Sequence, residues 1–192
     1  MNITIFGCSM HPLSRSFVLA KQAAQNLKDH HGVNVRLIDL RDYDMVFCGQ
    51  PEARDQPGLE ELQSGVQEAS AILVAVPIYN FYINAAAKNL IELTGRSWMY
   101  KLVGFLCAAG GTSSYMSVMS IANSLMLDFR TLIVPRFVYA TSDAFGNDRT
   151  KDMYVSDERI LDRIKELTDI TVALAKAVDP VIESLPEPGG RA

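Results

Sequence analysis

The chain has 192 residues, of which 48% are hydrophobic and 21% are charged, and its formal net charge is −4. This length suits one domain built around a full central sheet. The mild negative charge excludes the basic footprint of a nucleic-acid-binding protein, and no apolar run approaches the roughly 20 residues of a membrane span. We therefore expect no nucleic-acid partner and no membrane partner.

Two features favour a cytoplasmic location. Met1–Phe6 has the pattern of a buried strand and not of a signal peptide, because no basic segment precedes it and no long apolar run follows. The three cysteines, Cys8, Cys48 and Cys107, are too few and too scattered for a disulfide framework or a metal knuckle. We expect a reduced protein without a metal site, with Cys8 and Cys107 in its core.

Five short apolar segments alternate with five segments of helical spacing. The expected strands are Ile3–Phe6, Asn34–Leu40, Ala71–Val76, Leu102–Ala109 and Thr131–Val134, with an extension past Pro135 to Tyr139 left open. The expected helices are Ser16–Lys28, Gly58–Ala69, Asn84–Leu93, Ser114–Phe129 and Asp157–Val178. This alternation predicts an α/β fold with a five-stranded parallel sheet in the order 2-1-3-4-5 and helices on both faces.

We expect residues 1–179 to form a single domain, because no linker or internal repeat divides them. Pro180–Ala192 contains three prolines and two glycines and is predicted to be a flexible tail. Tyr43–Pro57 is predicted to be irregular, and Ala140–Val155 is predicted to be a long polar loop.

Ligands of doubly wound sheets bind outside the carboxyl ends of the strands, where the crossover direction switches. The loops that follow the first, third and fourth strands are Gly7–Ser16, Pro77–Tyr82 and Gly110–Tyr115. They are rich in small, hydroxyl and aromatic residues. This composition suits a ligand with a phosphate at one end and a flat ring at the other.

The first loop has the chemistry of an anion site. Ser9, Ser14 and Ser16 offer hydroxyls, Arg15 offers a planar set of donors, and a helix begins nearby. The competing interpretation is that Ser14 or Ser16 only caps the helix. The loop lacks GxGxxG and GxxxxGK[ST], so neither a dinucleotide fingerprint nor a P-loop is supported.

The second loop offers a wall for a flat ring such as that of a flavin. Pro77, Ile78, Tyr79 and Asn80 combine apolar and aromatic surface with an amide for the pyrimidine edge. The competing interpretation is a loop that packs on a neighbouring subunit, a role we assign to Phe81–Ile83.

The third loop begins with Gly110 and Gly111, which let the backbone approach a ring closely because no Cβ intervenes. Thr112 and Ser114 are able to cap the following helix with or without a ligand. We include Thr112 with the two glycines among the candidate ligand-binding residues.

From Asn2 to about Val178 the chain resembles the NAD(P)H-dependent FMN reductase family of flavodoxin-like proteins. The motifs that carry the resemblance are Gly7 with Ser9, Ser14-Arg15-Ser16, Pro77-x-Tyr79-Asn80, Lys88-Asn89-x-x-Glu92 and Gly110-Gly111-Thr112. The first loop is one residue longer than the family pattern, and Met10 or His11 stands where an arginine is often found. Tyr82-Ile83-Asn84-Ala85 replaces the usual Ser-x-Pro-Gly.

The resemblance implies a flavodoxin-like three-layer sandwich that binds FMN and uses NAD(P)H as co-substrate. Hydride would reach flavin N5 and pass to free flavin, a quinone or another small acceptor, with no dedicated catalytic residue. Arg15 is then expected to carry the charge that faces the phosphate. Lys88 and Asn89 are at least as well explained by structural or interface roles.

The resemblance also implies a homodimer or homotetramer. Phe81, Tyr82, Trp98, Met99 and Tyr100 lie near the Asn84–Leu93 helix and are expected to present an apolar surface to a second subunit. Two alternatives remain open at this point: an electron carrier of the flavodoxin type, and a module that has lost its flavin.

Overall fold

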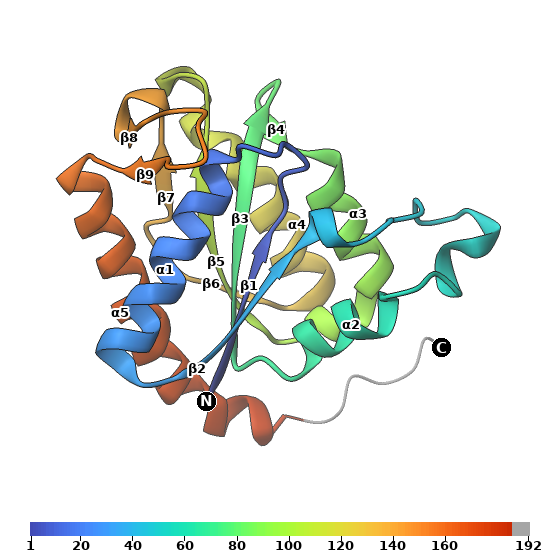
Figure 1. The fold of residues 1–192 in the computed structure, drawn as a ribbon. Helices are drawn as coiled ribbons and strands as arrows, with labels where there is room; N and C mark the ends of the chain where they lie inside the picture. The colour runs from blue at the N-terminus through green and yellow to red at the C-terminus, as the bar shows by residue number, and fades with distance from the viewer. Residues whose placement is uncertain (186–192) are drawn as a thin grey trace.

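A mostly parallel sheet forms the centre of the computed structural model, which describes residues 1–185 (Figure 1). Its strands are β1 (Asn2–Gly7), β2 (Asn34–Asp39), β3 (Ala71–Tyr79), β4 (Tyr82–Ile83), β5 (Leu102–Ala108), β6 (Leu132–Ile133) and β7 (Val138–Ala140). The order is β2-β1-β3-β5-β6, with β7 also paired to β5. β5 corresponds to the fourth predicted strand, and β6 together with β7 corresponds to the fifth. The observed order is therefore the predicted order, 2-1-3-4-5.

Helices cover both faces of the sheet and complete the predicted sandwich. They are α1 (Arg15–His31), α2 (Leu59–Gln67), α3 (Ala85–Thr94), α4 (Met119–Phe129) and α5 (Glu158–Glu183). Successive strand residues point to opposite faces, so β1 sends Ile3 and Ile5 toward α1 and α5, and Phe6 toward α2, α3 and α4. Cys8 and Cys107 are both in the core as predicted, and burial raises the pKa of both thiols.

The fifth strand is divided into two pieces. β5 pairs with β6 at Leu102↔Leu132 and with β7 at Leu106↔Val138. The β6–β7 segment therefore has two more residues than the stretch of β5 beside it, and the surplus is accommodated at Pro135-Arg136. Pro135 has no N–H to donate, and Arg136 has a φ of +61°.

The fourth predicted helix begins with a turn of different geometry. Residues Thr112–Val118 form a 3-10 segment, η4, and the α-helix α4 starts only at Met119. Ser114 inside η4 has non-helical dihedral angles, and its hydroxyl hydrogen-bonds the Tyr139 hydroxyl at 2.8 Å. A contact with β7 thus overrides the local helical pattern.

The last helix is longer than predicted. α5 continues through Pro180 to Glu183, so the predicted tail wrongly included its last turn. Pro180 is exposed, and its ring is accommodated near the end of the helix. The remainder of the predicted tail, 186–192, lies outside the described residues.

Smaller elements interrupt the loops. The predicted polar loop 140–155 contains the antiparallel pair β8 (Phe145–Gly146) and β9 (Tyr154–Val155). Single 3-10 turns lie at η1 (Leu40–Asp42), η2 (Pro51–Arg54), η3 (Gly95–Trp98) and η5 (Ser142–Ala144). Within residues 1–185, no helix is both long and apolar enough to cross a membrane.

Candidate active site

The three predicted ligand loops converge at one edge of the sheet. They follow β1, β3 and β5, which are neighbours in the sheet and run in the same direction, upward in Figure 1. The eleven candidate residues all lie in these loops or at the adjoining element ends: Ser9, Ser14, Arg15, Ser16, Pro77, Ile78, Tyr79, Asn80, Gly110, Gly111 and Thr112. Their contact with a ligand stays a prediction.

The serine hydroxyls of the first loop are buried and already held in place. Ser14 caps α1, because its Oγ accepts a hydrogen bond from the Phe17 N–H at 3.1 Å, and its Oγ lies 3.1 Å from that of Ser16. The Ser9 Oγ accepts from the His11 N–H at 3.2 Å. Ser14 is therefore the N-cap of α1. One hydroxyl of the Ser14–Ser16 pair donates to the other, which leaves one hydroxyl hydrogen of the pair to donate to an anion.

Arg15 is paired with a carboxylate from a distant loop. Its Nε and Nη2 donate to Asp148 Oδ1 and Oδ2 at 2.7 and 2.5 Å. These bonds hold the pKa of Asp148 below its ordinary value and raise that of Arg15. Arg15 thus reaches the loop as one half of an ion pair, and its charge is largely balanced before any phosphate arrives.

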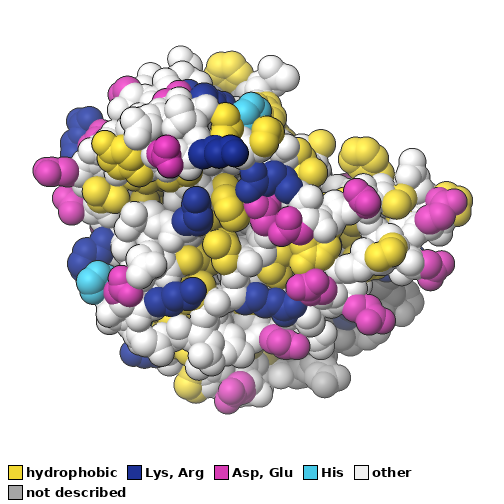
Figure 2. Space-filling view, in the orientation of Figure 1, with side chains coloured by type: hydrophobic (Ala, Val, Ile, Leu, Met, Phe, Trp, Pro, Cys, Tyr) yellow, Lys and Arg dark blue, Asp and Glu magenta, His cyan; other side chains and the backbone are white. Residues whose placement is uncertain are grey.

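Two further arginines contact the first loop. Arg41 donates to both carboxylate oxygens of Asp39 and, through Nη1, to the Pro12 carbonyl at 2.8 Å. Arg149 donates through Nη1 to the Leu13 carbonyl at 2.7 Å. Figure 2 shows lysine and arginine side chains gathered over the N-terminal half of α1.

Sequence reasoning missed both arginines. They lie in polar segments far from the loop along the chain, and no local motif marks them.

On the second loop, β3 continues through Pro77 to Tyr79, so the expectation that Pro77 ends the strand is wrong. The physical reason lies in the neighbouring strand. The Ala75 carbonyl accepts a hydrogen bond from the Cys8 N–H, so the backbone of Ala75 faces the β1 side of β3. Backbone groups two residues apart on a strand point to the same side, so the nitrogen of Pro77 also faces the β1 side. β1 has ended by that level, so the missing N–H of Pro77 breaks no ladder hydrogen bond.

A tight hairpin presents the aromatic residues of this loop. Tyr79 and Tyr82 pair across it, and both central residues have positive φ, +49° at Asn80 and +63° at Phe81. This geometry suits asparagine but is strained for phenylalanine. The hairpin projects Tyr79 and Phe81 outward, with 52% and 66% of their surfaces exposed.

The third loop leaves an open cradle. Neither Gly110 nor Gly111 has an atom within 4 Å of the position that a Cβ would take, and Thr112 is exposed beside them. The Gly111 carbonyl is fixed by the Tyr139 hydroxyl at 2.6 Å. The Tyr115 ring flanks this loop, 5.3 Å from that of Tyr139. The space beside the two glycine backbones is thus not filled by a neighbouring side chain.

A buried acceptor lies under the first loop. Asn84 donates its amide to the Cys8 carbonyl at 2.6 Å, while its Oδ1 is buried without a hydrogen-bond partner in the described part of the chain. Such a group is costly unless a donor reaches it. A polyhydroxyl chain between a phosphate and a ring carries donors of the required kind, so this residue also fits FMN.

Two neighbouring residues from the family motif have structural contacts. Lys88 forms an ion pair with Glu92 at 2.7 Å, and Asn89 anchors the 43–57 segment through the Cys48 N–H and the Val46 carbonyl. Trp98 was expected at the surface, and this is wrong. It is fully buried, where its indole N–H donates to Thr94 Oγ1 at 2.7 Å.

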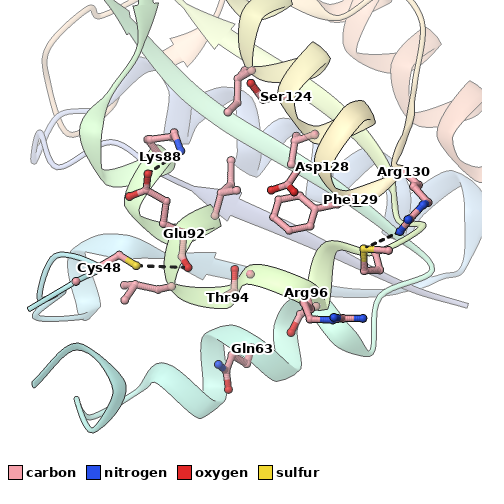
Figure 3. Close-up of a pocket in the computed structure, with 18 of the residues that line it drawn as sticks. Cys48, Gln63, Lys88, Glu92, Thr94, Arg96, Ser124, Asp128, Phe129 and Arg130 are labelled. Atoms are coloured by element: carbon pink, nitrogen blue, oxygen red, sulfur yellow. Dashed lines mark hydrogen bonds and ion pairs between the residues drawn. The ribbon is translucent and has the colours of Figure 1, made fainter. Parts of the chain in front are cut away.

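A separate groove of about 1030 Å³ lies between α3 and α4 (Figure 3). Charged side chains of both signs line it, among them Lys88, Glu92, Asp128 and Arg130. None of the eleven candidate residues contributes to this lining, so the groove is distinct from the three predicted ligand loops.

The doubly wound parallel sheet, with three loops meeting at its switch point, defines the flavodoxin-like fold. The family described as NADPH-dependent FMN reductase matches residues 1–146, and the chain belongs to that family. The protein is thus an NAD(P)H-dependent oxidoreductase, with FMN as its flavin and NAD(P)H as co-substrate.

Curated relatives agree with this membership. An NAD(P)H-dependent FAD/FMN reductase of Geobacillus thermodenitrificans is 26% identical over 137 residues, which cover 70% of this chain and 72% of the relative. An FMN reductase (NADPH) of Pseudomonas aeruginosa is 27% identical over 150 residues, covering 77% and 80%.

Solved structures share the fold. The flavoenzyme NAD(P)H:(acceptor) oxidoreductase FerB of Paracoccus denitrificans has a TM-score of 0.71 at 18% identity, covering 92% of this chain and 97% of FerB. RosB, solved with a bound flavin-phosphate intermediate, has a TM-score of 0.74 at 14% identity, covering 100% and 90%.

Proposed function

We propose that the chain transfers hydride from NAD(P)H through FMN to free flavin, a quinone or another small acceptor in the cytoplasm. The observation that carries this proposal is the convergence of three chemically different loops at one sheet edge. When bound, FMN supplies the N5 atom that accepts and passes on hydride. The protein binds, orients and shields the reactants.

The first loop is proposed to hold the phosphate. Ser9, Ser14 and Ser16 are fixed around the start of α1, whose free N–H groups add a positive end. Because the hydroxyls are buried and ordered before the ligand arrives, little conformational entropy is lost on binding.

The other two loops are proposed to hold the ring. Pro77, Ile78, Tyr79 and Asn80 form one wall, and Gly110, Gly111 and Thr112 form the opposite side. The nicotinamide ring is proposed to stack on the flavin face that the cradle leaves open. Hydride transfer between two stacked rings requires no acid or base from the protein, so no catalytic residue is assigned.

We further propose a homodimer or homotetramer. Exposed apolar side chains gather on the β3–β4 hairpin and on η4 with the start of α4, and the hairpin packs against η4. The members of this surface are Tyr79, Phe81, Tyr115, Met116 and Met119. Such a patch favours burial against a second copy. Light scattering at micromolar concentration tests this, and a monomeric mass would contradict it.

The test of the proposed function combines binding and turnover. The purified protein is titrated with FMN while its visible spectrum is recorded, and NADH and NADPH oxidation are then followed with free flavin, quinones and azo dyes as acceptors. We expect saturable flavin binding and acceptor-dependent oxidation. No flavin binding at tens of micromolar would contradict the proposal, and binding without oxidation would identify an electron carrier.

A further inference from the structure

Three arginines surround the first loop, but they are not equivalent. Arg15 and Arg41 are each held by both oxygens of a carboxylate, Asp148 and Asp39 respectively. Arg149, by contrast, has no carboxylate oxygen within ion-pair distance in residues 1–185, although its charge contributes to the lowered pKa of the neighbouring Asp148. It is the cation at this loop whose charge is least balanced by a neighbour.

The position of Arg149 is set by the β8–β9 connection. The Thr150 N–H and Oγ1 both donate to the Asn147 carbonyl, at 3.1 and 2.8 Å, and close a tight turn. Arg149 has a φ of +60° within this turn. Asp148, its neighbour, is bound to Arg15 on α1, so the turn is tied to the start of that helix (Figure 1).

The guanidinium of Arg149 extends over the first loop. Nη1 lies 2.7 Å from the Leu13 carbonyl and 3.3 Å from His11 Nδ1. His11 Nδ1 also accepts a hydrogen bond from the Leu13 N–H at 3.0 Å. The side chain of Arg149 therefore lies beside His11, one of the two loop positions, Met10 or His11, where the family pattern often has an arginine.

We propose that Arg149 provides the guanidinium that contacts the FMN phosphate, in place of an arginine in the first loop. This inference rests on the proposed function and adds a residue beyond the family match, which ends at 146. A guanidinium offers several donors in a plane, which suits phosphate oxygens. Nη1 of Arg149 is bound to the Leu13 carbonyl, and the other N–H groups of the guanidinium are available to the ligand.

The proposal predicts an effect that depends on the phosphate alone. Riboflavin has the ring and the polyhydroxyl chain of FMN but no phosphate. Loss of Arg149 should weaken FMN binding and leave riboflavin binding unchanged. A hydrogen bond to a charged group corresponds to an affinity change of about tenfold to hundredfold.

The experiment measures FMN and riboflavin affinities by flavin fluorescence for the full chain and its variants. Arg149→Gln should weaken FMN binding by about tenfold or more. The FMN affinity of Arg149→Lys should lie between those of the unsubstituted chain and Arg149→Gln, because lysine keeps the charge but loses the planar donors. Lys151→Gln is the matched control. It removes the same charge from an exposed position in the same turn and should leave both affinities unchanged.

Each outcome either supports or overturns the proposed contact between Arg149 and the FMN phosphate. Equal losses for FMN and riboflavin in Arg149→Gln would show that Arg149 only shapes the loop and would overturn the proposal. An unchanged FMN affinity would overturn it too. Failure of the proposed function is distinguishable, because the unsubstituted chain would then bind neither flavin. A weaker dependence of FMN binding on salt in Arg149→Gln would support a direct charge contact.

Discussion

The first loop and the proposed ring side of the candidate site are built by different means. At the first loop, side chains from distant parts of the chain meet: Arg15 bonds Asp148, and Arg149 bonds Leu13. At the ring side, the backbone itself forms the surface, through the strained hairpin at Asn80-Phe81 and the bare glycines at 110 and 111.

The difference indicates how the two ends recognise a ligand. In the proposed site, the hydroxyls and guanidinium groups of the first loop are expected to select a charge, since their hydrogen bonds fix them before binding. The ring side is expected to select a shape, because the backbone beside Gly110 and Gly111 is open. Substitutions at the two ends should therefore separate according to whether the ligand carries a phosphate.

The largest expected effect comes from filling the ring-side cradle. Gly111 has an extended backbone with φ of −164°, and a Cβ there meets no atom, so Gly111→Val should fold normally. The valine side chain would take up the space that we propose for the flavin ring. We expect FMN and riboflavin affinities to fall together, by about tenfold or more, equivalent to at least ~1.4 kcal/mol.

Parallel titrations of the two flavins and a thermal melt check this prediction. A loss confined to FMN would place the phosphate, and not the ring, beside Gly111. An unchanged affinity for both flavins would remove this loop from the site.

At the first loop, Ser14 has two separable roles. Ser14→Ala should lower the stability of the protein by about 1 kcal/mol through loss of the α1 cap. It should also weaken FMN binding by about tenfold through loss of a hydroxyl donor. Ser14→Asp is the informative partner, because aspartate caps helices well but repels a phosphate.

Denaturation curves and FMN titrations of both variants separate the roles. We expect Ser14→Asp to keep the stability and lose the FMN affinity. If Ser14→Asp binds FMN as the unsubstituted chain does, the phosphate does not lie at the start of α1.

A smaller effect is expected at the hairpin. Phe81→Gly replaces a strained positive-φ residue with the one best suited to it and creates an Asn-Gly turn. The folded state should gain about 1 kcal/mol, or roughly 2–4 °C in melting temperature. A calorimetric scan measures this. A lower melting temperature would mean that the Phe81 ring contributes more by packing than its backbone costs.

The smallest expected effect is that of pH on the Arg15–Asp148 pair. The pKa of Asp148 lies below its ordinary 3.8 because Arg15 donates to the carboxylate. A carboxyl with a lowered folded pKa stabilises the fold above its unfolded pKa and loses that contribution as the pH falls through the folded value. Stability should thus be insensitive to this pair from about pH 5 upward and should decline below about pH 4.

Denaturation of the unsubstituted chain and Asp148→Asn across pH 3 to 8 tests this. The difference between the two should be constant above about pH 5 and should shrink in acid. A difference that changes near neutral pH would contradict the pairing.

Much of the fold was predictable because its signals are local. The apolar run at Ala71–Val76 marks a strand buried on both faces, and Asn84 before an apolar helical pattern marks the start of α3. The division of the fifth strand and the 3-10 start of the fourth helix were not predictable. Both depend on pairing with β5 and on the Tyr139–Ser114 bond, which join residues distant in the sequence.

The candidate site divides in the same way. The three loops were found because each directly follows a strand, and topology alone brings such loops together. The partners of the first loop were missed because Arg15 and Asp148 are separated by 133 residues. Trp98 was misplaced because an aromatic residue in a loop gives no sign of whether a core lies beneath it.

The most direct test of the account asks where FMN binds. Backbone amide shifts of the isotope-labelled chain, followed by NMR during an FMN titration, report every contact at once. We predict that the largest changes fall on Ser9–Ser16, Tyr79-Asn80 and Gly110–Thr112 and that they saturate together. Changes concentrated instead on Lys88, Glu92 and Asp128, in the groove between α3 and α4, would contradict the three-loop site.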